Sequence, residues 1–399
     1  MNSMTALVDS YTPGMTLPQG FYTDQTIFET EMQAIFCTQW LFAGHSCDVA
    51  QPGQYFTLPI GRESVIVIRD RDGTLRAHFN VCRHRGSKLA WHDRGWVKTL
   101  VCPYHGWVYQ LDGTLQAARF MEDFTCDEYP LVSAAIREVA GLIFVCLSPQ
   151  PPDFVMPAAA IAPQLLPHRL EQAKVIVRDR YRVQANWKTI LENNRECYHC
   201  QVAHPEFMLA NYDAGLPGDD RNGNTRFQQT RAAAYQRWQT LGLSPHEVSF
   251  PNGSWFRITR LPLRDGFLTE SLHGRLTAPP MVDVPDLDVG SLRLVGMPNF
   301  WGHANVDYTM TTQVIPISAH ETQIDVAFLV RQDAVEGIDY AVDDVAAVWR
   351  ATSAQDWQIC EHNYAGICSS AYRPGRLSAS MEASVTEFIN WYLRQMTDR

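Results

Sequence analysis

Two short stretches decide how this chain folds: VCRHRGSKLA at residues 81–90 and VCPYHGW at residues 101–107. Each places a cysteine and a histidine within three residues of one another, and seventeen residues separate the two pairs. Two thiolates and two imidazoles on neighbouring loops make a complete ligand set for a metal centre. Zinc accepts four such ligands in a tetrahedral site, whereas a [2Fe–2S] cluster can take two cysteines on one iron and two histidines on the other. The four candidate ligands are Cys82, His84, Cys102 and His105.

Three features of these stretches favour the iron–sulfur cluster. The Cys-x-His spacing is tight for a zinc module. Both pairs follow apolar β segments, HFNV and KTLV, so each pair lies on a loop at the end of a predicted strand. Gly86 and Gly106 come soon after the two histidines, where a glycine lets backbone amides approach the cluster sulfurs closely. Structural zinc is the alternative that the residues leave open.

The motif C-R-H-R-G followed by C-P-Y-H-G-W resembles the Rieske motif of the non-haem iron oxygenases. Respiratory-type Rieske proteins carry an additional cysteine pair, and here those positions are Ser87 and Tyr104, so that branch fits poorly. The resemblance covers nearly the whole chain. It implies the α (oxygenase) subunit of such an enzyme, with a catalytic domain of the helix-grip, START-like type.

The sequence outside these motifs predicts an α+β protein in three parts. Residues 1–38 predict an arm and a helix packed with the catalytic domain, because the apolar residues of TIFETEMQAIF recur at helical spacing. Residues 39–150 predict a small antiparallel β Rieske domain, since short β-rich runs alternate with turn signals such as RDGT. Residues 151–399 begin in a proline-rich junction and predict the catalytic mononuclear iron domain, in which helices cover one large antiparallel sheet.

A second candidate metal site lies in ENNRECYHCQVAHPEF, residues 192–207. A helix is predicted from near Asn186, and residues three apart on a helix share a face, so Glu196 and His199 are expected to point the same way. His204 precedes a proline, which predicts that the helix ends there. Two histidines and one carboxylate on one face of an iron leave open positions for O₂ and substrate.

This stretch resembles the E/D-x-x-H-x-x-x-x-H motif of the oxygenase α subunits, which bind a mononuclear Fe(II). The resemblance makes His199 and His204 two of its ligands. The third ligand in the family is an aspartate far downstream, and Asp356, in SAQDWQICE on a long predicted helix, fits that position. The family also implies a homotrimer in which a carboxylate joins the cluster of one subunit to the iron of its neighbour. Glu196 matches that electron-transfer bridge, although most members have aspartate there.

Electrons must come from a partner, because no G-x-G-x-x-G nicotinamide fingerprint follows a predicted strand. The resemblance implies a separate flavin and iron–sulfur reductase that oxidises NAD(P)H. A basic group in the cluster loops of this acidic chain is expected to dock an acidic reductase. A solvated loop or a subunit contact is the alternative. The group comprises Arg83, Arg85, Lys88, Arg94 and Lys98.

Composition excludes several other classes. A net charge of −10 argues against nucleic-acid binding, which needs a concentrated basic face. No apolar run approaches the roughly 20 residues of a membrane helix, and the first residues lack the pattern of a secretory signal, so a cytoplasmic location is the default expectation. The ten cysteines are then expected to stay reduced or to bind metal. Cys197 and Cys200 are interpreted as buried small side chains outside the coordination.

The stretches around the second site, with the run at 372–375 (YRPG), are similar to the branch acting on quaternary ammonium compounds such as glycine betaine, proline betaine, carnitine and choline. The implied reaction hydroxylates an N-methyl group, and the carbinolamine then releases formaldehyde and a tertiary amine. A trimethylammonium group favours an aromatic cage, and His303 or Arg257 would donate to a betaine carboxylate. Core packing is the alternative for each ring. The candidate rings are Trp255, Phe256, Phe300, Trp301 and Tyr308.

Two further functions stay open on the sequence. One is a Rieske ring-hydroxylating dioxygenase or O-demethylase for an aromatic acid, which an apolar cavity without a cage would support. The other is an electron-transfer Rieske protein without oxygenase activity, which applies if His199 or His204 does not bind metal.

Overall fold

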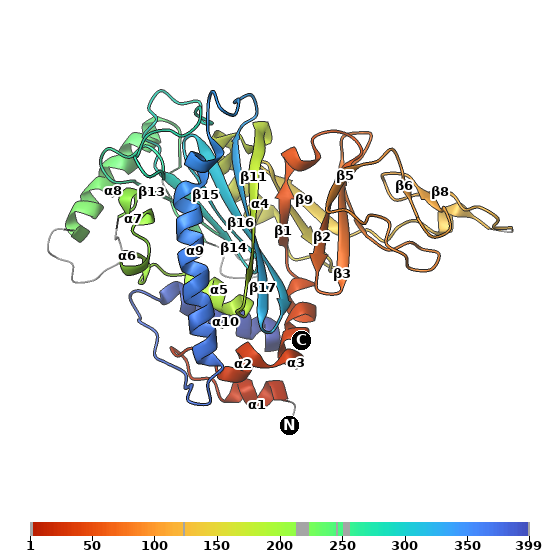
Figure 1. Cartoon of the computed structure of the whole chain (residues 1–399), viewed down its shortest axis with the longest axis horizontal. Coiled ribbons are helices and arrows are strands. Elements are labelled where there is room, and N and C mark those ends of the chain that lie inside the picture. The colour runs from red at the N-terminus through yellow and green to blue at the C-terminus, as the bar shows by residue number, and fades with distance from the viewer. Residues whose placement is uncertain (1–2, 123, 213–222, 245, 250–255, 398–399) are drawn as a thin grey trace.

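The computed structural model describes residues 3–122, 124–212, 223–244, 246–249 and 256–397 (Figure 1). Its elements confirm the predicted α+β architecture. Several short sheets project to one side of the molecule. One large sheet, crossed by a long helix, forms the other side (Figure 1).

The short sheets are antiparallel and have the strand orders β4-β3-β2-β5, β1-β10-β9 and β6-β7-β8. The predicted RDGT turn joins β3 to β4: Gly73 adopts a φ of +84°, and the Asp72 carboxylate accepts the N–H of Thr74 at 2.8 Å. The strands are β1 (Leu41–His45), β2 (Gln54–Ile60), β3 (Glu63–Arg69), β4 (Leu75–Phe79), β5 (Arg94–Trp96), β6 (Leu100–Val101), β7 (Val108–Tyr109), β8 (Leu115–Ala117), β9 (Ala135–Val139) and β10 (Leu142–Cys146).

The large sheet is antiparallel, with the strand order β11-β17-β16-β15-β14-β13-β12. Because side chains alternate along a strand, its middle strands present two different faces. One face packs against β1, β10 and the segment around Phe154. The other faces the helices (Figure 1). The strands are β11 (Ala173–Val183), β12 (Val248–Ser249), β13 (Phe256–Leu261), β14 (Ser291–Gly296), β15 (Phe300–Ala304), β16 (Tyr308–Ser318) and β17 (Glu321–Arg331).

The 26-residue helix α9 crosses the second face of this sheet, and α5 packs beside it (Figure 1). None of the described helices is long and apolar enough to cross a membrane. The α-helices are α1 (Ser3–Asp9), α2 (Gln19–Thr23), α3 (Gln25–Glu31), α4 (Val155–Leu165), α5 (Trp187–Asn194), α6 (Cys200–Ala203), α7 (Phe207–Ala210), α8 (Gly223–Thr240), α9 (Val342–Ile367) and α10 (Ala383–Thr397). The remaining turns are a π-helical η1 (Met32–Phe36) and 3₁₀ segments η2 (Ser46–Val49), η3 (Cys126–Glu128), η4 (Leu166–His168) and η5 (Leu170–Gln172).

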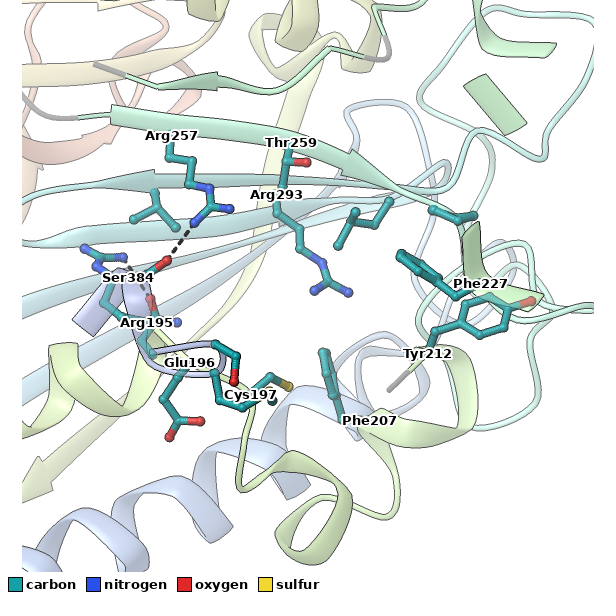
Figure 2. Close-up of a pocket in the computed structure, with 16 residues that line it drawn as sticks. Arg195, Glu196, Cys197, Phe207, Tyr212, Phe227, Arg257, Thr259, Arg293 and Ser384 are labelled. Carbon is teal, nitrogen blue, oxygen red and sulfur yellow. Dashed lines mark hydrogen bonds between the residues drawn. The ribbon is translucent and has the colours of Figure 1, made fainter. Parts of the chain in front are cut away.

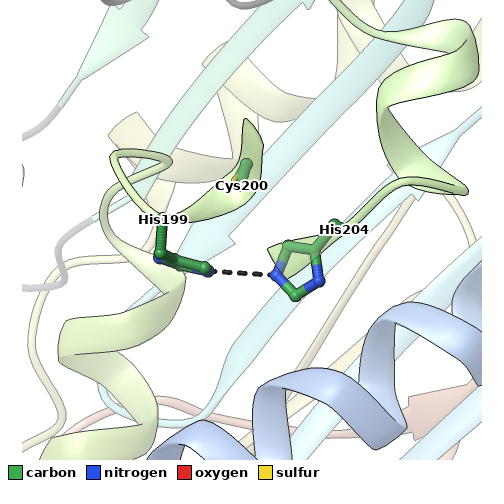
Figure 3. A group of neighbouring side chains, drawn as sticks. All are labelled: His199, Cys200 and His204. Atoms are coloured by element: carbon green, nitrogen blue, oxygen red, sulfur yellow. Dashed lines mark hydrogen bonds between the residues drawn. The ribbon is translucent and has the colours of Figure 1, made fainter. Parts of the chain in front are cut away.

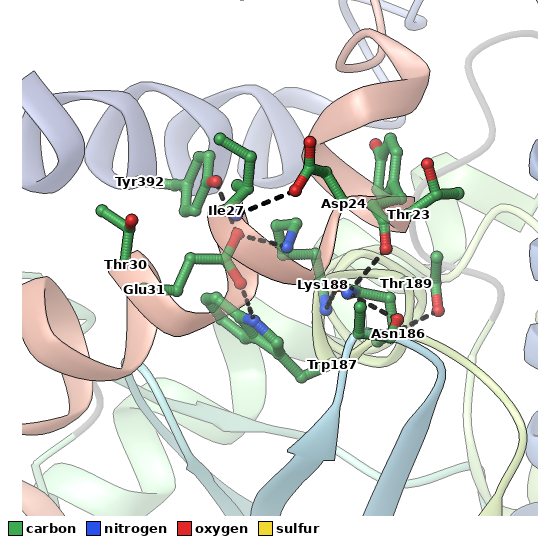
Figure 4. A network of polar contacts seen from close by, with 12 residues as sticks. Thr23, Asp24, Ile27, Thr30, Glu31, Asn186, Trp187, Lys188, Thr189 and Tyr392 are labelled. Carbon is green, nitrogen blue, oxygen red and sulfur yellow. Dashed lines mark hydrogen bonds and ion pairs between the residues drawn. The ribbon is translucent and has the colours of Figure 1, made fainter. Parts of the chain in front are cut away.

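The N-terminal helices pack against α5 and α10 around a buried ion pair (Figure 4). Glu31 of α3 accepts hydrogen bonds from Lys188 Nζ, from Trp187 Nε1 at 2.7 Å and from Tyr392 Oη at 2.6 Å. Both charged side chains are completely buried. Since a buried carboxylate is tolerated where its oxygens are fully satisfied, these contacts fix where α5 begins, and α5 leads directly into the histidine stretch.

A second charge cluster, centred on the buried carboxylate of Asp48, joins the short sheets to the large one. Asp48 of η2 accepts a hydrogen bond from Arg178 of β11 and lies 2.9 Å from Arg94 of β5. Burial raises the pKa of Asp48, but the hydrogen bond and charge of His45 and the charges of both arginines hold it well below its usual range. The carboxylate therefore stays ionised and ties β5 to β11.

Candidate active site

The two cysteine–histidine loops adopt the same turn. The N–H of Gly86 donates to the Cys82 carbonyl, and the N–H of Gly106 donates to the Cys102 carbonyl, each at 3.0 Å. Both glycines have a positive φ, +77° and +72°, which a side chain would strain. Both cysteines are 2 % exposed, and the His84 and His105 rings lie nearer the surface, 4.6 Å apart.

The surroundings of these loops fit a [2Fe–2S] cluster. The Cys82 sulfur lies 3.3 Å from the Tyr109 hydroxyl, and the Trp107 ring stacks on His84 at 4.9 Å. His84 Nδ1 is buried and has no hydrogen-bond partner within the described residues, as expected of a nitrogen that faces a metal. Two inner thiols and two outer imidazoles are the ligand set that a Rieske cluster requires.

The second histidine pair meets Asp356 of α9. His199 Nε2 and His204 Nε2 face each other at 3.1 Å (Figure 3), and Asp356 Oδ1 lies 3.3 Å and 3.0 Å from them. Cys200 is close to both rings, but its sulfur is bonded to Cys197. Two imidazole nitrogens and one carboxylate oxygen therefore converge on one point, a donor set that suits Fe(II).

A second layer of contacts orients both rings. His199 Nδ1 lies 2.6 Å from Glu196 Oε1, and His204 Nδ1 lies 2.9 Å from Gln355 Oε1. Such partners fix the tautomer, so that each Nε2 presents its lone pair inward. Burial lowers the pKa of His199, but its hydrogen bonds to the carboxylates of Asp356 and Glu196, together with their charges, raise it to about 9. The negative charges of Asp356 and Glu196 also favour a bound metal cation.

The helix expected through this stretch ends earlier than predicted. α5 stops at Asn194, and residues 195–199 form turns, because the Glu196 carboxylate accepts the backbone N–H of Tyr198 and competes with helical bonding. Glu196 and His199 still meet, through this turn and not through a helix face. The interpretation of Cys197 and Cys200 as buried small side chains holds for Cys200 and is wrong for Cys197, which is exposed. The two form a disulfide, contrary to the expectation that the cysteines stay reduced or bind metal.

A cavity opens over the three converging atoms. Its inner part, about 150 Å³, is lined by those ligands and by aromatic side chains. An outer part of about 350 Å³ lies beneath β13 and β14 and shares the lining residues Phe207 and Arg293 with the inner part (Figure 2). The rings beside the ligands are Phe207 of α7, Trp301 of β15, His303 of β15 and Trp349 of α9.

The structure separates the predicted aromatic residues by sheet face. Trp301 and His303 line the cavity, as expected. Phe256 and Phe300 do not, contrary to the prediction: they point to the opposite face, where they pack against Phe144 at 5.5 Å and 6.0 Å. The cause is the period of two along β13 and β15, which turns these positions away from the helices.

The three remaining predicted residues, Tyr308, Trp255 and Arg257, have different outcomes. Tyr308 is fully buried behind the cavity wall, where its hydroxyl donates to the Glu270 carbonyl and accepts from Trp349 Nε1. Trp255 lies outside the described residues. Arg257 lines the outer cavity but is bound to Ser384 Oγ at 2.8 Å.

Sequence reasoning missed Phe207 and Trp349. A signal for Trp349 was present in the sequence. Trp349 lies seven residues before Asp356 and Thr352 lies four residues before it, and this spacing places all three side chains on one face of a helix. Phe207 comes three residues after His204, within the next short helix, where no pattern distinguishes a cavity ring from core packing.

Comparisons with known proteins identify the family of the chain. Residues 39–130 match the Rieske [2Fe-2S] domain family, and residues 170–398 match the family described as ring hydroxylating alpha subunit (catalytic domain). The glycine betaine monooxygenase oxygenase subunit of Pseudomonas aeruginosa (strain UCBPP-PA14) is 40% identical over 384 residues, which are 96% of this chain and 89% of that protein. The carnitine monooxygenase oxygenase subunit of Escherichia coli (strain K12) is 37% identical over 48% of this chain and 53% of its own length. The solved structure of the quaternary ammonium Rieske monooxygenase CntA with L-carnitine covers 97% of both chains with a TM-score of 0.70 and 22% identity.

Proposed function

Because this chain belongs to the ring-hydroxylating α-subunit family of Rieske oxygenases, we propose that it is the terminal oxygenase that N-demethylates a quaternary ammonium compound, with glycine betaine or proline betaine as the first candidates. The observation that carries this proposal is the convergence of His199, His204 and Asp356 beneath a cavity walled by aromatic rings. A protein that only transfers electrons does not need a second set of metal ligands beneath a substrate cavity.

The aromatic wall supports a cationic substrate. The Phe207 and Trp349 rings lie 5.6 Å apart, and Trp301 lines the same inner cavity. Ring faces attract a quaternary ammonium group, and tryptophan does so most strongly. These rings would hold the N-methyl groups beside the metal ligands while excluding water.

The reaction would consume O₂, two electrons and two protons. Iron bound by the triad would supply O₂ activation, with electrons passed on from the Rieske cluster. One methyl C–H gains an oxygen atom and the other oxygen leaves as water. The N–CH₂OH product then breaks its C–N bond, and the nitrogen keeps the electron pair, giving formaldehyde, a tertiary amine and a proton. The chain's own contribution is to hold the substrate and to keep both imidazoles oriented through Glu196 and Gln355.

The electron path requires two partners. A second copy of the chain in a homotrimer would bring its cluster to Glu196, which already contacts His199 and would bridge to a cluster histidine. A separate NAD(P)H-dependent reductase would reduce the cluster. Arg83, Arg85 and Lys88 are exposed near the cluster and support docking of an acidic reductase, whereas Arg94 is engaged by Asp48.

The test is coupled turnover of the purified holoenzyme with a reductase and NAD(P)H. Formaldehyde is measured against glycine betaine, proline betaine, carnitine and choline, with an aromatic acid and its methyl ether as the comparison arm. Formaldehyde matched to O₂ consumption with a quaternary amine supports the proposal. Turnover of the aromatic substrates alone, or no turnover of any, contradicts it.

A further inference from the structure

One arginine of the cavity wall has a distinctive position. Arg293 lies on β14 opposite Thr259 of β13, on the face that points toward the helices. Its guanidinium extends into the middle of the cavity, between the sheet and Phe207 (Figure 2). Arg293 lines both the inner and the outer part, so it stands where the space over the metal ligands opens outward.

The charge of Arg293 is only partly compensated. Its closest hydrogen bond, at 2.5 Å, is to the neutral amide oxygen of Asn211. The carboxylate that pairs with it within the described residues is that of Glu270, whose Oε1 lies 3.8 Å away. That carboxylate is engaged more closely by His303 Nδ1 at 3.0 Å and by Asn305 Nδ2 at 3.2 Å. Arg293 Nε is buried and, among the described residues, has no hydrogen-bond partner.

Arg257 offers a contrast within the same cavity. Its guanidinium donates to Ser384 Oγ at 2.8 Å, and its Nε lies 3.1 Å from Glu247 Oε1. Arg257 is therefore committed to the protein, whereas Arg293 keeps donor capacity directed at the cavity. This distinction favours Arg293 over Arg257, one of the two residues that the sequence suggested for a substrate carboxylate, the other being His303.

The positive charge of Arg293 disfavours a ligand that carries a positive charge and no negative one. A trimethylammonium group bound to the aromatic wall would be repelled by Arg293 in a poorly screened cavity. A zwitterion removes the conflict, because its carboxylate can accept two parallel N–H bonds from the planar guanidinium. We propose that Arg293 binds the carboxylate of a betaine and selects betaines over choline; this inference rests on the proposed function.

The test compares glycine betaine with choline, which carries the same trimethylammonium group and a neutral hydroxyl. In Arg293→Gln, kcat/KM for glycine betaine falls at least about 30-fold, mostly through KM, because a buried charge pair loses one partner. Choline turnover changes less than about threefold or improves, because it never used the guanidinium. Arg293→Lys retains the charge without the fork and gives an intermediate loss.

Iron content and cluster absorption establish that each variant is folded and loaded. Arg182→Gln, which removes an exposed arginine paired with Glu321 on the same sheet, is the matched control and leaves the substrate ratio unchanged. An equal fall in kcat/KM for both substrates, or an undiminished preference for glycine betaine, overturns the proposed role of Arg293. Arg293 would then serve only to hold α7 in place through its hydrogen bond to Asn211.

Direct titration of both compounds into the holoenzyme separates this inference from the proposed function. If the wild type demethylates none of the four quaternary amines, the proposed function fails. Tighter binding of glycine betaine than of choline, lost in Arg293→Gln, would still support the carboxylate site. Equal binding of the two compounds, or no binding of either, overturns it.

Discussion

The two metal sites of this chain are built in opposite ways. The residues proposed as cluster ligands come from two copies of one glycine-ended turn, within 81–107, and each cysteine is placed by hydrogen bonds to its own loop. The mononuclear triad joins a turn after α5 to the middle of α9, and the partner that orients His204 is 151 residues away from it. One site is a local motif, and the other is assembled by the packing of helices on a sheet.

This difference predicts that the two sites can be lost separately. The cluster depends on loop geometry and on its immediate neighbours Tyr109 and Trp107. The mononuclear site depends on where α5 and α9 lie on the large sheet. Substitutions that shift α5 or α9 should therefore weaken metal binding at the mononuclear site before they affect the cluster.

The largest effect is expected from Asp356→Ala. It removes the one carboxylate among the three converging atoms, so mononuclear iron is lost and formaldehyde release falls by more than about 100-fold, beyond the cost of losing a supporting partner. The visible absorption of the cluster should persist. Asp343→Ala, on an exposed position of the same helix, is the control. Full iron content in Asp356→Ala would contradict the ligand assignment.

Glu196→Ala should interrupt electron transfer between the two sites without loss of either metal. If Glu196 bridges two subunits, both metals stay bound while coupled turnover drops about 10- to 100-fold, because one outer contact of His199 and the electron path are lost together. Glu196→Gln keeps an acceptor for His199 Nδ1 and should lose less. Metal analysis measures whether both metals stay bound, and rapid reduction of the cluster measures whether it still accepts electrons. Single-turnover assays measure whether those electrons reach the mononuclear iron. Normal turnover in Glu196→Ala would refute the bridge.

Gln355→Ala removes the partner of His204 Nδ1 and should lower affinity for mononuclear iron by about tenfold. The cluster should be untouched, because the hydrogen-bond partners of Gln355 in the described part of the chain, His204 and Glu206, both lie on the catalytic side. Gln355→Glu, which keeps an acceptor, is the matched variant. Titration with a chelator measures the affinity, and an unchanged value would show that the ring needs no such support.

The smallest effect on turnover is expected from Lys188→Met. It leaves Glu31 buried without its cation, which costs about 3–5 kcal/mol in the free energy of unfolding. Because this pair positions the start of α5, mononuclear iron should be released on heating before the cluster bleaches. Removal of the exposed Arg182–Glu321 pair, worth no more than about 1 kcal/mol, provides the comparison. Simultaneous loss of both metals would contradict the idea of two separable sites.

The sequence by itself predicted which residues hold the cluster and where the short strands around them lie. Cys82, His84, Cys102 and His105 lie within two turns whose spacing and glycines dictate local geometry. The β-rich runs and their turn signals likewise define strands from neighbouring residues alone. The histidine pair and its downstream aspartate were also accessible, but through resemblance to a family and not through spacing.

Tertiary structure alone decided what surrounds the catalytic site. The period of two along β13 and β15 divides side chains between two faces, but both faces are buried, so apolarity cannot tell which one meets a cavity. Phe256 and Phe300 therefore went to the core, while Arg293 and Trp301 reached the cavity. The free donor capacity of Arg293 depends on which charges the fold places near it, and that arrangement arises between elements far apart in the chain.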